Sequence, residues 1–567
     1  MHEHAERGTA SLVKTYEILA SDLQSNGVEA VFGLMSDDTA LLVTALEAVG
    51  IRFYSARHEN NAVVMAEGYS ASSGRLGVAV IGRGPGAANC MNAVIHASRT
   101  GAPVLVVCGA DPLSSGAPNA MGPDYKAFDI ARLFSVAGLR TFVASSVGTA
   151  RPALADAIAA ARAGELVTLH LPTDVQFSTT ENCAPTFAAN FTKSAPLAAG
   201  RQSAVKAAAE LLAKSRHPLI LAGYGAYRAG AKDALVGLAD RTGALLITSL
   251  RAKDLFLGSP FDLGIAGSFS HSTARRYVGE ADCVLVVGAS LNLLTSSFGD
   301  FLPPAPVVQV DVDRRHIGRY CYADVAVVGD ARQVAEQLLE AVPDRSAADK
   351  PFHAEEVRRQ IAGFHHSQDF QEAHTDWTVD PRSLAIELDK LLPLDRDVVF
   401  DLGNFFAVAP YIAVPNPGCL RYTGDFNSIG LGFGTAMGVA AAKRSRPTVL
   451  FIGDGSLFMT LGELETMARE DLPLIILVMN DNAYGAERHY LELRSQPLGK
   501  SVFPAFDFAP IAQACGIDAY TVRSIADLRN LADLLKTPEG PILIDCKINP
   551  AVAAPFMGEF ARLDGHR

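Results

Sequence analysis

Short runs of consecutive apolar residues recur along the chain, and longer alanine-rich segments separate them. The runs at 77–81 and 283–287 are typical, because they contain no charged position and valine is their commonest residue. A run without polar alternation indicates a strand that is buried on both faces, and such strands separated by helices are typical of parallel sheets. The pattern therefore predicts an α/β protein with crossover helices.

The predicted strands fall into three groups, with a polar linker expected at 176–195 and a charged linker at 343–375. The strands are expected at 30–32, 77–81, 103–108 and 166–170, at 218–222, 244–248, 283–287 and 307–311, and at 398–401, 448–452, 474–478 and 541–545. We predict three doubly wound parallel-sheet domains at residues 1–180, 196–342 and 376–567. Ligands of such sheets bind at the carboxyl ends of the strands, so the residues directly after each run are the functional candidates.

The composition is that of a folded protein: 49 % of the 567 residues are hydrophobic and 19 % are charged. The net charge of −12 and the lack of a long Lys/Arg run argue against nucleic acid and anionic membranes as partners. No apolar stretch reaches the roughly 20 residues of a membrane helix, and no apolar segment follows the charged first residues, so we expect a cytoplasmic protein. The eight cysteines form no CxxC or Cys/His cluster, which argues against a disulfide framework and a structural zinc site.

Acidic residues follow two successive strands of the third group. Asp454, between Gly453 and Gly455, comes directly after one strand, and Asp481 follows the next. A single crossover would bring both carboxylates to the same edge of the sheet, where they could hold Mg²⁺ while the glycines let the backbone approach a diphosphate. Gly-Asp-Gly alone is most often a tight turn, and the second carboxylate is what favours a metal–diphosphate site.

With these motifs the chain resembles the thiamine-diphosphate-dependent enzymes of the acetolactate synthase, pyruvate oxidase and 2-oxo acid decarboxylase group, over nearly its whole length. The resemblance implies thiamine diphosphate and Mg²⁺ as cofactors, with Asp454, Asp481 and the carbonyl of Ala483 as metal ligands. Asp481 stands where the family usually has Asn, and its extra charge predicts a stronger Mg²⁺ dependence of cofactor binding. The resemblance also places these residues at the cofactor: Gly453, Gly455, Ser456, Asn482, Tyr484 and Gly485.

A second motif, residues 57–62, precedes a helix of small residues in the first group. The resemblance implies that Glu59 hydrogen-bonds N1′ of the aminopyrimidine ring and so supports removal of the proton from thiazolium C2. A carboxyl with this role must hold or share a proton near neutral pH, which burial favours. In another setting, a Glu at a helix N-terminus is most often a capping or dipole residue.

A third motif, residues 427–434, precedes a glycine-rich helix in the third group. The resemblance implies that Ile429 wedges between the two cofactor rings and that the carbonyl of Asn427 accepts a hydrogen bond from the 4′-amino group. Gly403 and Asn404 lie in a loop that resembles the one touching the diphosphate, although the family's common Gln/His pair is absent.

The middle group contains a strand end at 310–313 that is similar to the place where some relatives bind FAD. Other relatives bind nothing there. The sequence is compatible with FAD and does not require it.

Four further residues bear on the reaction. Asp37 and Glu487 stand where pyruvate decarboxylase-like relatives carry acids, Lys126 stands near a Gln of the synthases, and His271 could enter the site from the middle domain. The resemblance makes Asp37, Glu487 and Lys126 catalytic candidates at the reacting carbon. Two carboxylates that converge there would repel, so the pKa of one of them should rise. Taken singly, each of the four is more often a solvated or structural residue.

We therefore predict a carboligase/lyase that decarboxylates a 2-oxo acid and passes the enamine to a proton or a carbonyl acceptor. The decarboxylases' adjacent His pair is absent, so ligation should compete with protonation. A 2-hydroxyacyl lyase or a cyclic-dione hydrolase is the alternative within enzymes, and a non-catalytic α/β binding protein is the alternative of another class. The family builds its site between subunits, which implies a homodimer or a homotetramer.

Overall fold

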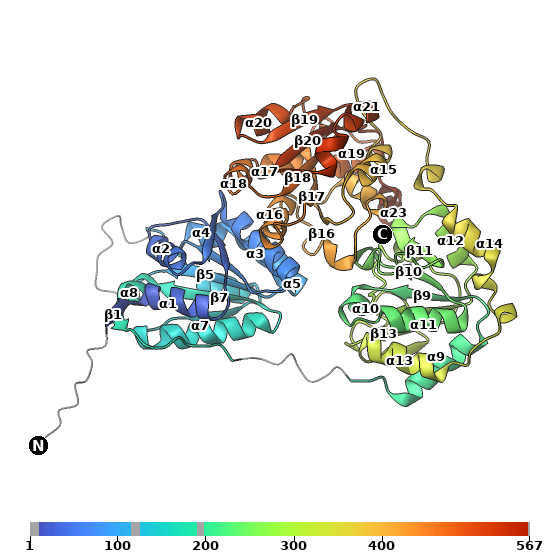
Figure 1. Cartoon of the computed structure of the whole chain (residues 1–567), viewed down its shortest axis with the longest axis horizontal. Coiled ribbons are helices and arrows are strands. Elements are labelled where there is room, and N and C mark those ends of the chain that lie inside the picture. The colour runs from blue at the N-terminus through green and yellow to red at the C-terminus, as the bar shows by residue number, and fades with distance from the viewer. Residues whose placement is uncertain (1–10, 115–124, 190–197, 565–567) are drawn as a thin grey trace, which may run out of the picture.

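The computed structural model, which describes residues 11–114, 125–189 and 198–564, contains three α/β domains, each with one six-stranded parallel sheet. Figure 1 shows the first domain in blue and cyan, the central domain in green and yellow, and the third in orange and red. The predicted fold class is confirmed. In the described residues, no helix combines the length and the apolar character that a membrane crossing needs.

The sheet of the first domain has the order β3-β2-β4-β5-β7-β6. Its strands are β2 (Ala30–Gly33), β3 (Arg52–Ser55), β4 (Gly77–Ile81), β5 (Val104–Ala110), β6 (Arg140–Val143) and β7 (Leu166–Pro172). Its helices are α1 (Thr15–Ser25), α2 (Ala40–Ala48), α3 (Glu59–Ser73), α4 (Pro85–Asn89), α5 (Met91–Thr100), α6 (Ile130–Val136), α7 (Val147–Arg162) and α8 (Thr173–Phe177). Helices α3 and α5 share a buried apolar cluster with one face of the sheet, and α1, α2 and α7 share another with the opposite face.

The sheet of the third domain has the order β16-β15-β17-β18-β20-β19, which is the topology of the first domain. Its strands are β15 (Asp397–Phe400), β16 (Leu420–Tyr422), β17 (Thr448–Gly453), β18 (Leu474–Asn480), β19 (Asp518–Val522) and β20 (Ile542–Lys547). Its helices are α15 (Pro381–Leu391), α16 (Gly432–Ala442), α17 (Asp454–Met459), α18 (Glu463–Arg469), α19 (Gly485–Glu492), α20 (Ala509–Ala514), α21 (Ile525–Arg529), α22 (Ala532–Lys536) and α23 (Pro555–Asp564).

The central domain has a different strand order, β11-β10-β9-β12-β13-β14. Its strands are β9 (Pro218–Ala222), β10 (Leu245–Thr248), β11 (Asp262–Ile265), β12 (Cys283–Val287), β13 (Val307–Asp311) and β14 (Val325–Val328). Its helices and the following connection include α9 (Gln202–Lys214), α10 (Tyr224–Arg228), α11 (Lys232–Thr242), α12 (Ser272–Gly279), α13 (Ala331–Ala341) and α14 (Glu355–Ala362). The order reverses between β9 and β12, the kind of point where doubly wound sheets bind ligands.

The sequence prediction found all of the inner strands and none of the edge strands. In each sheet the four inner strands agree with predicted runs to within a few residues, whereas β3, β6, β11, β14, β16 and β19 were missed. The inner strands are almost wholly buried, but the edge strands include exposed and partly exposed positions, as in Arg52–Ser55 and Arg140–Val143. An edge strand has solvent beside it and needs no continuous apolar run.

The prediction of a linker at 176–195 is wrong for residues 176–181, which belong mainly to a helix, α8 (Thr173–Phe177), and a strand. Gln176 is buried in α8 and donates through Nε2 to the carbonyl of Leu171 at 2.8 Å. The next strand, β8 (Thr179–Glu181), pairs antiparallel with β1 (Leu12–Lys14). This polar segment is therefore held by main-chain pairing that leaves no apolar pattern, while its end at 190–195 lies outside the described residues.

The first and third domains meet through helices α3 and α16, which lie side by side in Figure 1. The contact requires glycine: a Cβ at Gly68 would lie 2.2 Å from the carbonyl oxygen of Thr435, and one at Gly438 would lie 2.0 Å from that of Met65. Small residues thus let the two backbones approach closely. This contact joins the two domains within one chain and sets the position of the site.

Candidate active site

Two buried acids lie at the carboxyl edge of the third sheet. Strands β17 and β18 are neighbours with Gly453 paired to Met479, so Asp454 and Asp481 emerge side by side. Both are at least nine-tenths buried. Burial is the main cause that raises the pKa of each above its ordinary value, and the charge of Asp454 raises the pKa of Asp481 further. Neither carboxylate forms an ion pair with a Lys or Arg of the described residues, so the edge favours a cation.

The turn after β18 fits a metal with oxygen ligands. Asp481 Oδ1 accepts from the backbone N–H of Ala483 at 3.2 Å, which ties the second carboxylate to the residue whose carbonyl was predicted as a ligand. Two carboxylates and a carbonyl are hard oxygen donors of the kind that Mg²⁺ prefers. A Cβ at Gly485 would lie 2.4 Å from Asp481 Oδ2, and one at Gly455 would lie 2.7 Å from the Tyr484 ring. Glycine therefore keeps this cradle open.

One cavity gathers most of the residues that the sequence predicted for the third domain. It is lined by Gly403, Asn404, Ile429, Gly453, Asp454, Gly455, Ser456, Asp481, Ala483, Tyr484, Gly485 and Glu487. Asn427 and Asn482 do not line it. Asn482 lies with Phe506 and Lys547 in a separate cavity, and its Oδ1 accepts from the N–H of Phe506 at 3.2 Å.

Ile429 is held by a turn that the buried Asp401 supports. Asn427 and Gly430 on either side of it have φ of +58° and +83°. Asp401 Oδ2 accepts from the N–H of Gly430 at 2.7 Å, and Oδ1 accepts from Thr423 Oγ1 at 3.0 Å. Burial raises the pKa of Asp401 to about 6. The sequence analysis missed this positioning residue, although an Asp directly after a buried strand was a usable signal.

Glu59 is the first residue of α3 and faces the α4 turn. Its Oε2 accepts from Asn89 Nδ2 at 3.1 Å, and a Cβ at Gly86 would lie 3.3 Å from its Oε1. From the next helix, Asn92 Nδ2 donates to Ser428 Oγ at 2.9 Å, beside Ile429. The structure therefore brings the second and third sequence motifs together across the contact between domains.

A second acid that the sequence analysis missed bridges the same contact. Glu463, 1 % exposed, accepts through Oε1 from the N–H of Arg57 and from Asn61 Nδ2, both at 2.9 Å. These donors lie on either side of Glu59. No sequence pattern indicated this partner, because Glu463 lies in another domain.

Asp37 and Lys126 form an ion pair with each other. The hydrogen bond from Lys126 lowers the pKa of Asp37 to about 2, although the side chain is more than half exposed. The ionised form of Asp37 is thus favoured, so this acid is not the one of the pair whose pKa the predicted repulsion would raise. Among the described contacts none joins it to Glu487, which lines the cavity of the third domain. Lys126 has φ of +54°, and its carbonyl packs on Gly84 in the α4 turn.

His271 lies in a neighbouring cavity rather than in the one above. That second cavity shares Asn404 and Phe405 with the first. The His271 ring stacks on Phe364 with centroids 3.9 Å apart, and burial lowers its pKa to about 4. His271 therefore lines this second cavity as a neutral imidazole.

Another cavity lies at the topological switch point of the central domain, and Phe406 and Tyr422 of the third domain also line it. It has a volume of about 350 Å³ and includes Gly225, Gly288, Asp311 and His316, at or just beyond the ends of β9, β12 and β13. This is the strand end that the sequence compared with FAD sites, and FAD binding stays a prediction. The described residues hold no cluster of three or more His, Cys, Asp or Glu side chains arranged for a metal.

Family models match all three domains. Residues 13–130 match "Thiamine pyrophosphate enzyme, N-terminal TPP binding domain", 205–338 match the central domain of these enzymes, and 401–546 match their C-terminal TPP binding domain. These matched ranges include the three sequence motifs and the two acids at the carboxyl ends of β17 and β18.

Curated relatives align along nearly the whole chain. A probable acetolactate synthase large subunit of Methanocaldococcus jannaschii is 26 % identical over 97 % of this chain and 94 % of its own length. The sulfoacetaldehyde acetyltransferase of Castellaniella defragrans is 27 % identical over 90 % of this chain and 88 % of its own. A probable 2-ketoarginine decarboxylase of Pseudomonas aeruginosa is 30 % identical over 90 % and 89 %. With its three domains, its paired strand-end acids and these relatives, the chain belongs to the thiamine pyrophosphate enzymes.

Proposed function

We propose that this protein is a thiamine-diphosphate- and Mg²⁺-dependent carboligase/decarboxylase that cleaves a 2-oxo acid and transfers the acyl unit to a proton or a carbonyl acceptor. The observation that carries the proposal is the assembly of Glu59, Ile429 and the Asp454/Asp481 edge around the α3–α16 contact. The family is established, whereas the substrate and the exact reaction belong to the proposal.

Asp454, Asp481 and the carbonyl of Ala483 are proposed to hold Mg²⁺, and the glycines around them make room for a diphosphate. When bound, thiamine diphosphate supplies the electron sink that makes cleavage next to a carbonyl feasible. Ile429, held by Asp401, is proposed to set the bend of the cofactor. The remaining residues of this cavity are proposed to bind the cofactor or to hold it in position.

Glu59 is proposed to move the proton on which cofactor activation depends. Asn89 and the Gly86 turn fix one side of its carboxyl, while Glu463 fixes the backbone before it and the Asn61 side chain after it. A carboxyl that is held in one orientation can exchange a proton with a ring nitrogen without first losing conformational freedom. Glu463 is thus a positioning residue.

The substrate side is proposed to combine Glu487 with the Asp37–Lys126 pair. Lys126 keeps Asp37 ionised, and the hydrogen bond with Asp37 raises the pKa of the Lys126 ammonium, so neither group releases a proton readily near neutral pH. The relatives are described as a synthase, an acetyltransferase and a decarboxylase, all of which are consistent with transfer of an acyl unit. Without a strong acid at this point, we expect ligation to compete with protonation.

The subunit assembly and the cytoplasmic location stay predictions. The first and third domains already meet within one chain, so a homodimer or a homotetramer rests on the family resemblance. Light scattering of the active enzyme measures it directly.

A product screen tests the proposed reaction. The holoenzyme is incubated with a panel of 2-oxo acids alone and with aldehyde or ketone acceptors, and with acyl-CoA thioesters and cyclic diones as controls. We expect CO₂ release and, by mass, both ligated and protonated products from at least one 2-oxo acid. Turnover of only the thioesters or diones would overturn the proposal.

A further inference from the structure

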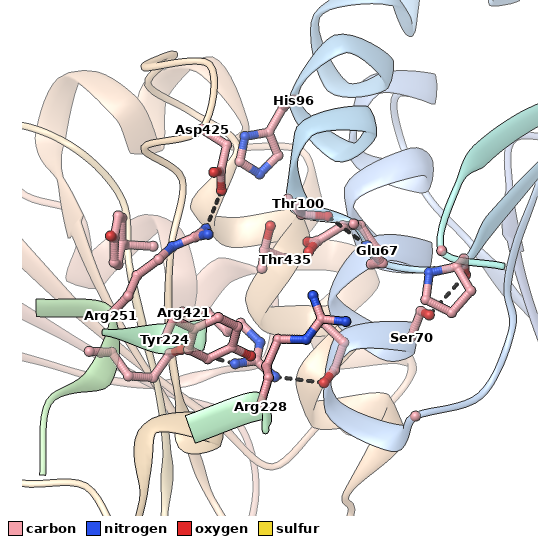
Figure 2. A pocket seen from close by; sticks show the side chains of 18 of the residues that line it. Glu67, Ser70, His96, Thr100, Tyr224, Arg228, Arg251, Arg421, Asp425 and Thr435 are labelled. Carbon is pink, nitrogen blue, oxygen red and sulfur yellow. Dashed lines mark hydrogen bonds and ion pairs between the residues drawn. The ribbon is translucent and has the colours of Figure 1, made fainter. Parts of the chain in front are cut away.

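A cavity of about 380 Å³ lies where all three domains meet, away from the residues proposed for catalysis. The first domain contributes residues of α3 and α5, the central domain contributes α10 and the segment after β10, and the third domain contributes β16 and α16. Figure 2 shows the charged side chains that point into it from these separate elements. A ligand here would touch all three domains at once.

The charged groups around this cavity leave an excess of positive charge. Asp425 is already paired with Arg251. Arg421 donates to the carbonyl oxygens of Ala71 at 2.6 Å and Leu420 at 3.0 Å, and so meets no carboxylate in these hydrogen bonds. These hydrogen bonds give Arg421 no carboxylate partner, and Glu67 interacts with it through charge alone.

Arg228, which is exposed to solvent, is the cation of this group without a protein partner among the described residues. It extends from the end of α10 toward the middle of the cavity (Figure 2), and it makes no hydrogen bond or ion pair with the described part of the chain. Arg162, on the wall, has the carbonyl of Asn26 as its single acceptor among the residues that the structure describes. Planar guanidinium groups bind carboxylate and phosphate oxygens through paired hydrogen bonds, so the free partner of these arginines would be an anion.

Glu67 and His96 do not cancel this charge. Burial raises the pKa of Glu67 to about 7, so the carboxyl is only partly ionised near neutral pH. Burial lowers the pKa of His96 to about 4, which keeps the imidazole neutral. The remaining polar wall includes Thr100 and the Tyr224 ring.

We propose that this three-domain cavity is a binding site for a small organic anion, a carboxylate or a phosphate ester, which Arg228 and Arg421 recognise. The anion would neutralise the excess positive charge that the described residues leave in the cavity. The proposal does not depend on which reaction the enzyme catalyses.

Occupancy of the site should affect the cofactor site through two helices. Glu67 and Glu59 lie on α3, about 12 Å apart along its axis at 1.5 Å per residue. Thr435, on the cavity wall, belongs to α16, which follows the Ile429 turn. An anion that braces the α3–α16 contact would strengthen cofactor retention, and by linkage the cofactor would strengthen anion binding.

Calorimetry of the holoenzyme, saturated with thiamine diphosphate and Mg²⁺, tests the proposal. Inorganic phosphate and succinate are titrated separately at constant ionic strength, which distinguishes the phosphate from the carboxylate chemistry. We expect saturable binding of at least one probe, weakened about tenfold or more in Arg228→Gln, since a hydrogen bond to a charged group is lost. Arg228→Lys should recover part of the affinity because it keeps the charge.

Arg216→Gln is the matched control, because this exposed arginine of the same domain lies outside the cavity. It should bind like the wild type. Hydrogen exchange in the second half of α3 and in residues 420–435 should slow on binding in the wild type and not in Arg228→Gln. The absence of saturable binding by either probe, or equal affinity in the wild type and Arg228→Gln, would overturn the proposal.

Discussion

The first and third domains share one strand order, but the ends of their corresponding strands carry different charges. In the first domain, the Gly-x-Gly turn after β4 has Arg83 in its middle, and Asp111 follows β5; Arg83 Nη1 donates to Asp111 Oδ1 at 2.8 Å. In the third domain, the equivalent turn after β17 has Asp454, and Asp481 follows β18. Because Arg83 occupies the position that corresponds to Asp454, the first domain has an ion pair where the third has two acids that repel each other.

The difference shows that the topology brings the strand ends together, whereas the side chains at those ends determine whether they form an ion pair or a candidate cation site. In the first domain Arg83 neutralises Asp111 at this edge. The third leaves Asp454 and Asp481 buried without a Lys or Arg ion pair among the described residues, and the proposed Mg²⁺ would supply the missing positive charge. The same contrast separates the two helices at the contact: α3 begins with Glu59, which can move a proton, and Ile429, which can only fill space, precedes α16.

The largest expected effect comes from removing the acid that makes the two edges different. Asp454→Ala should abolish holoenzyme formation, because one of the two proposed carboxylate ligands is lost. Asp111→Ala, at the place in the first domain that corresponds to Asp481, should retain Mg²⁺-dependent cofactor binding. Bound thiamine diphosphate after gel filtration measures both. Full cofactor retention by Asp454→Ala in the absence of metal would break the comparison.

Glu59→Gln tests the contrast between the two helices. The variant should still bind cofactor, since the metal edge is intact, but should lose roughly 10²–10⁴-fold in the rate of C2 proton exchange of the bound cofactor. Hydrogen/deuterium exchange followed by NMR reports that rate. An exchange rate equal to that of the wild type would show that Glu59 is only a helix-terminal residue.

Asp481→Asn sharpens the charge argument, because Asn keeps an oxygen ligand and removes one negative charge. The ratio of cofactor affinities with Mg²⁺ and with chelator should fall roughly tenfold, as about 1.4 kcal/mol of lost repulsion would give. Cofactor titration under both conditions measures it. The idea fails if the wild type binds cofactor equally well with and without the metal.

The pH dependence of stability follows from the same two acids. Burial raises the pKa of Asp454 to about 7, and burial together with the charge of Asp454 raises the pKa of Asp481 to about 8. Between about pH 4 and 8 the folded, metal-free protein binds protons that the unfolded chain has released, so this pair destabilises the fold increasingly as pH rises. The melting temperature of Asp481→Asn should exceed that of the wild type by more at pH 8 than at pH 5, and Mg²⁺ should remove the difference. A gap that does not depend on pH would contradict the raised pKa values.

The smallest expected effect concerns the substrate side. Asp37→Asn should loosen Lys126, and together with Glu487→Gln it should change the ratio of ligated to protonated product a few-fold, with cofactor affinity unchanged. Mass analysis of products at several pH values measures the ratio. Should both variants keep the wild-type ratio and pH profile, these residues belong to a solvated rim.

The sequence was most informative where burial is complete. The inner strands, such as Thr448–Gly453, are buried on both faces and must be apolar throughout, so their pattern can be read directly. The residues after them, Asp454 and Asp481, could be paired because parallel neighbours end at one edge. The edge strands and the β1–β8 pair have solvent on one side and left no such signal.

What only the tertiary structure decided are the contacts between residues far apart in the chain. The sequence by itself determined the fold class, the inner strands and the motifs that carry Glu59, Ile429 and Asp454, because these depend on local pattern and on strand order. The support of the Glu59 segment by Glu463, the fixed charge of Asp37 beside Lys126 and the arginine-lined cavity of three domains depend on how finished domains pack. No periodicity records such packing, since each partner looks like an ordinary polar residue until the fold places it.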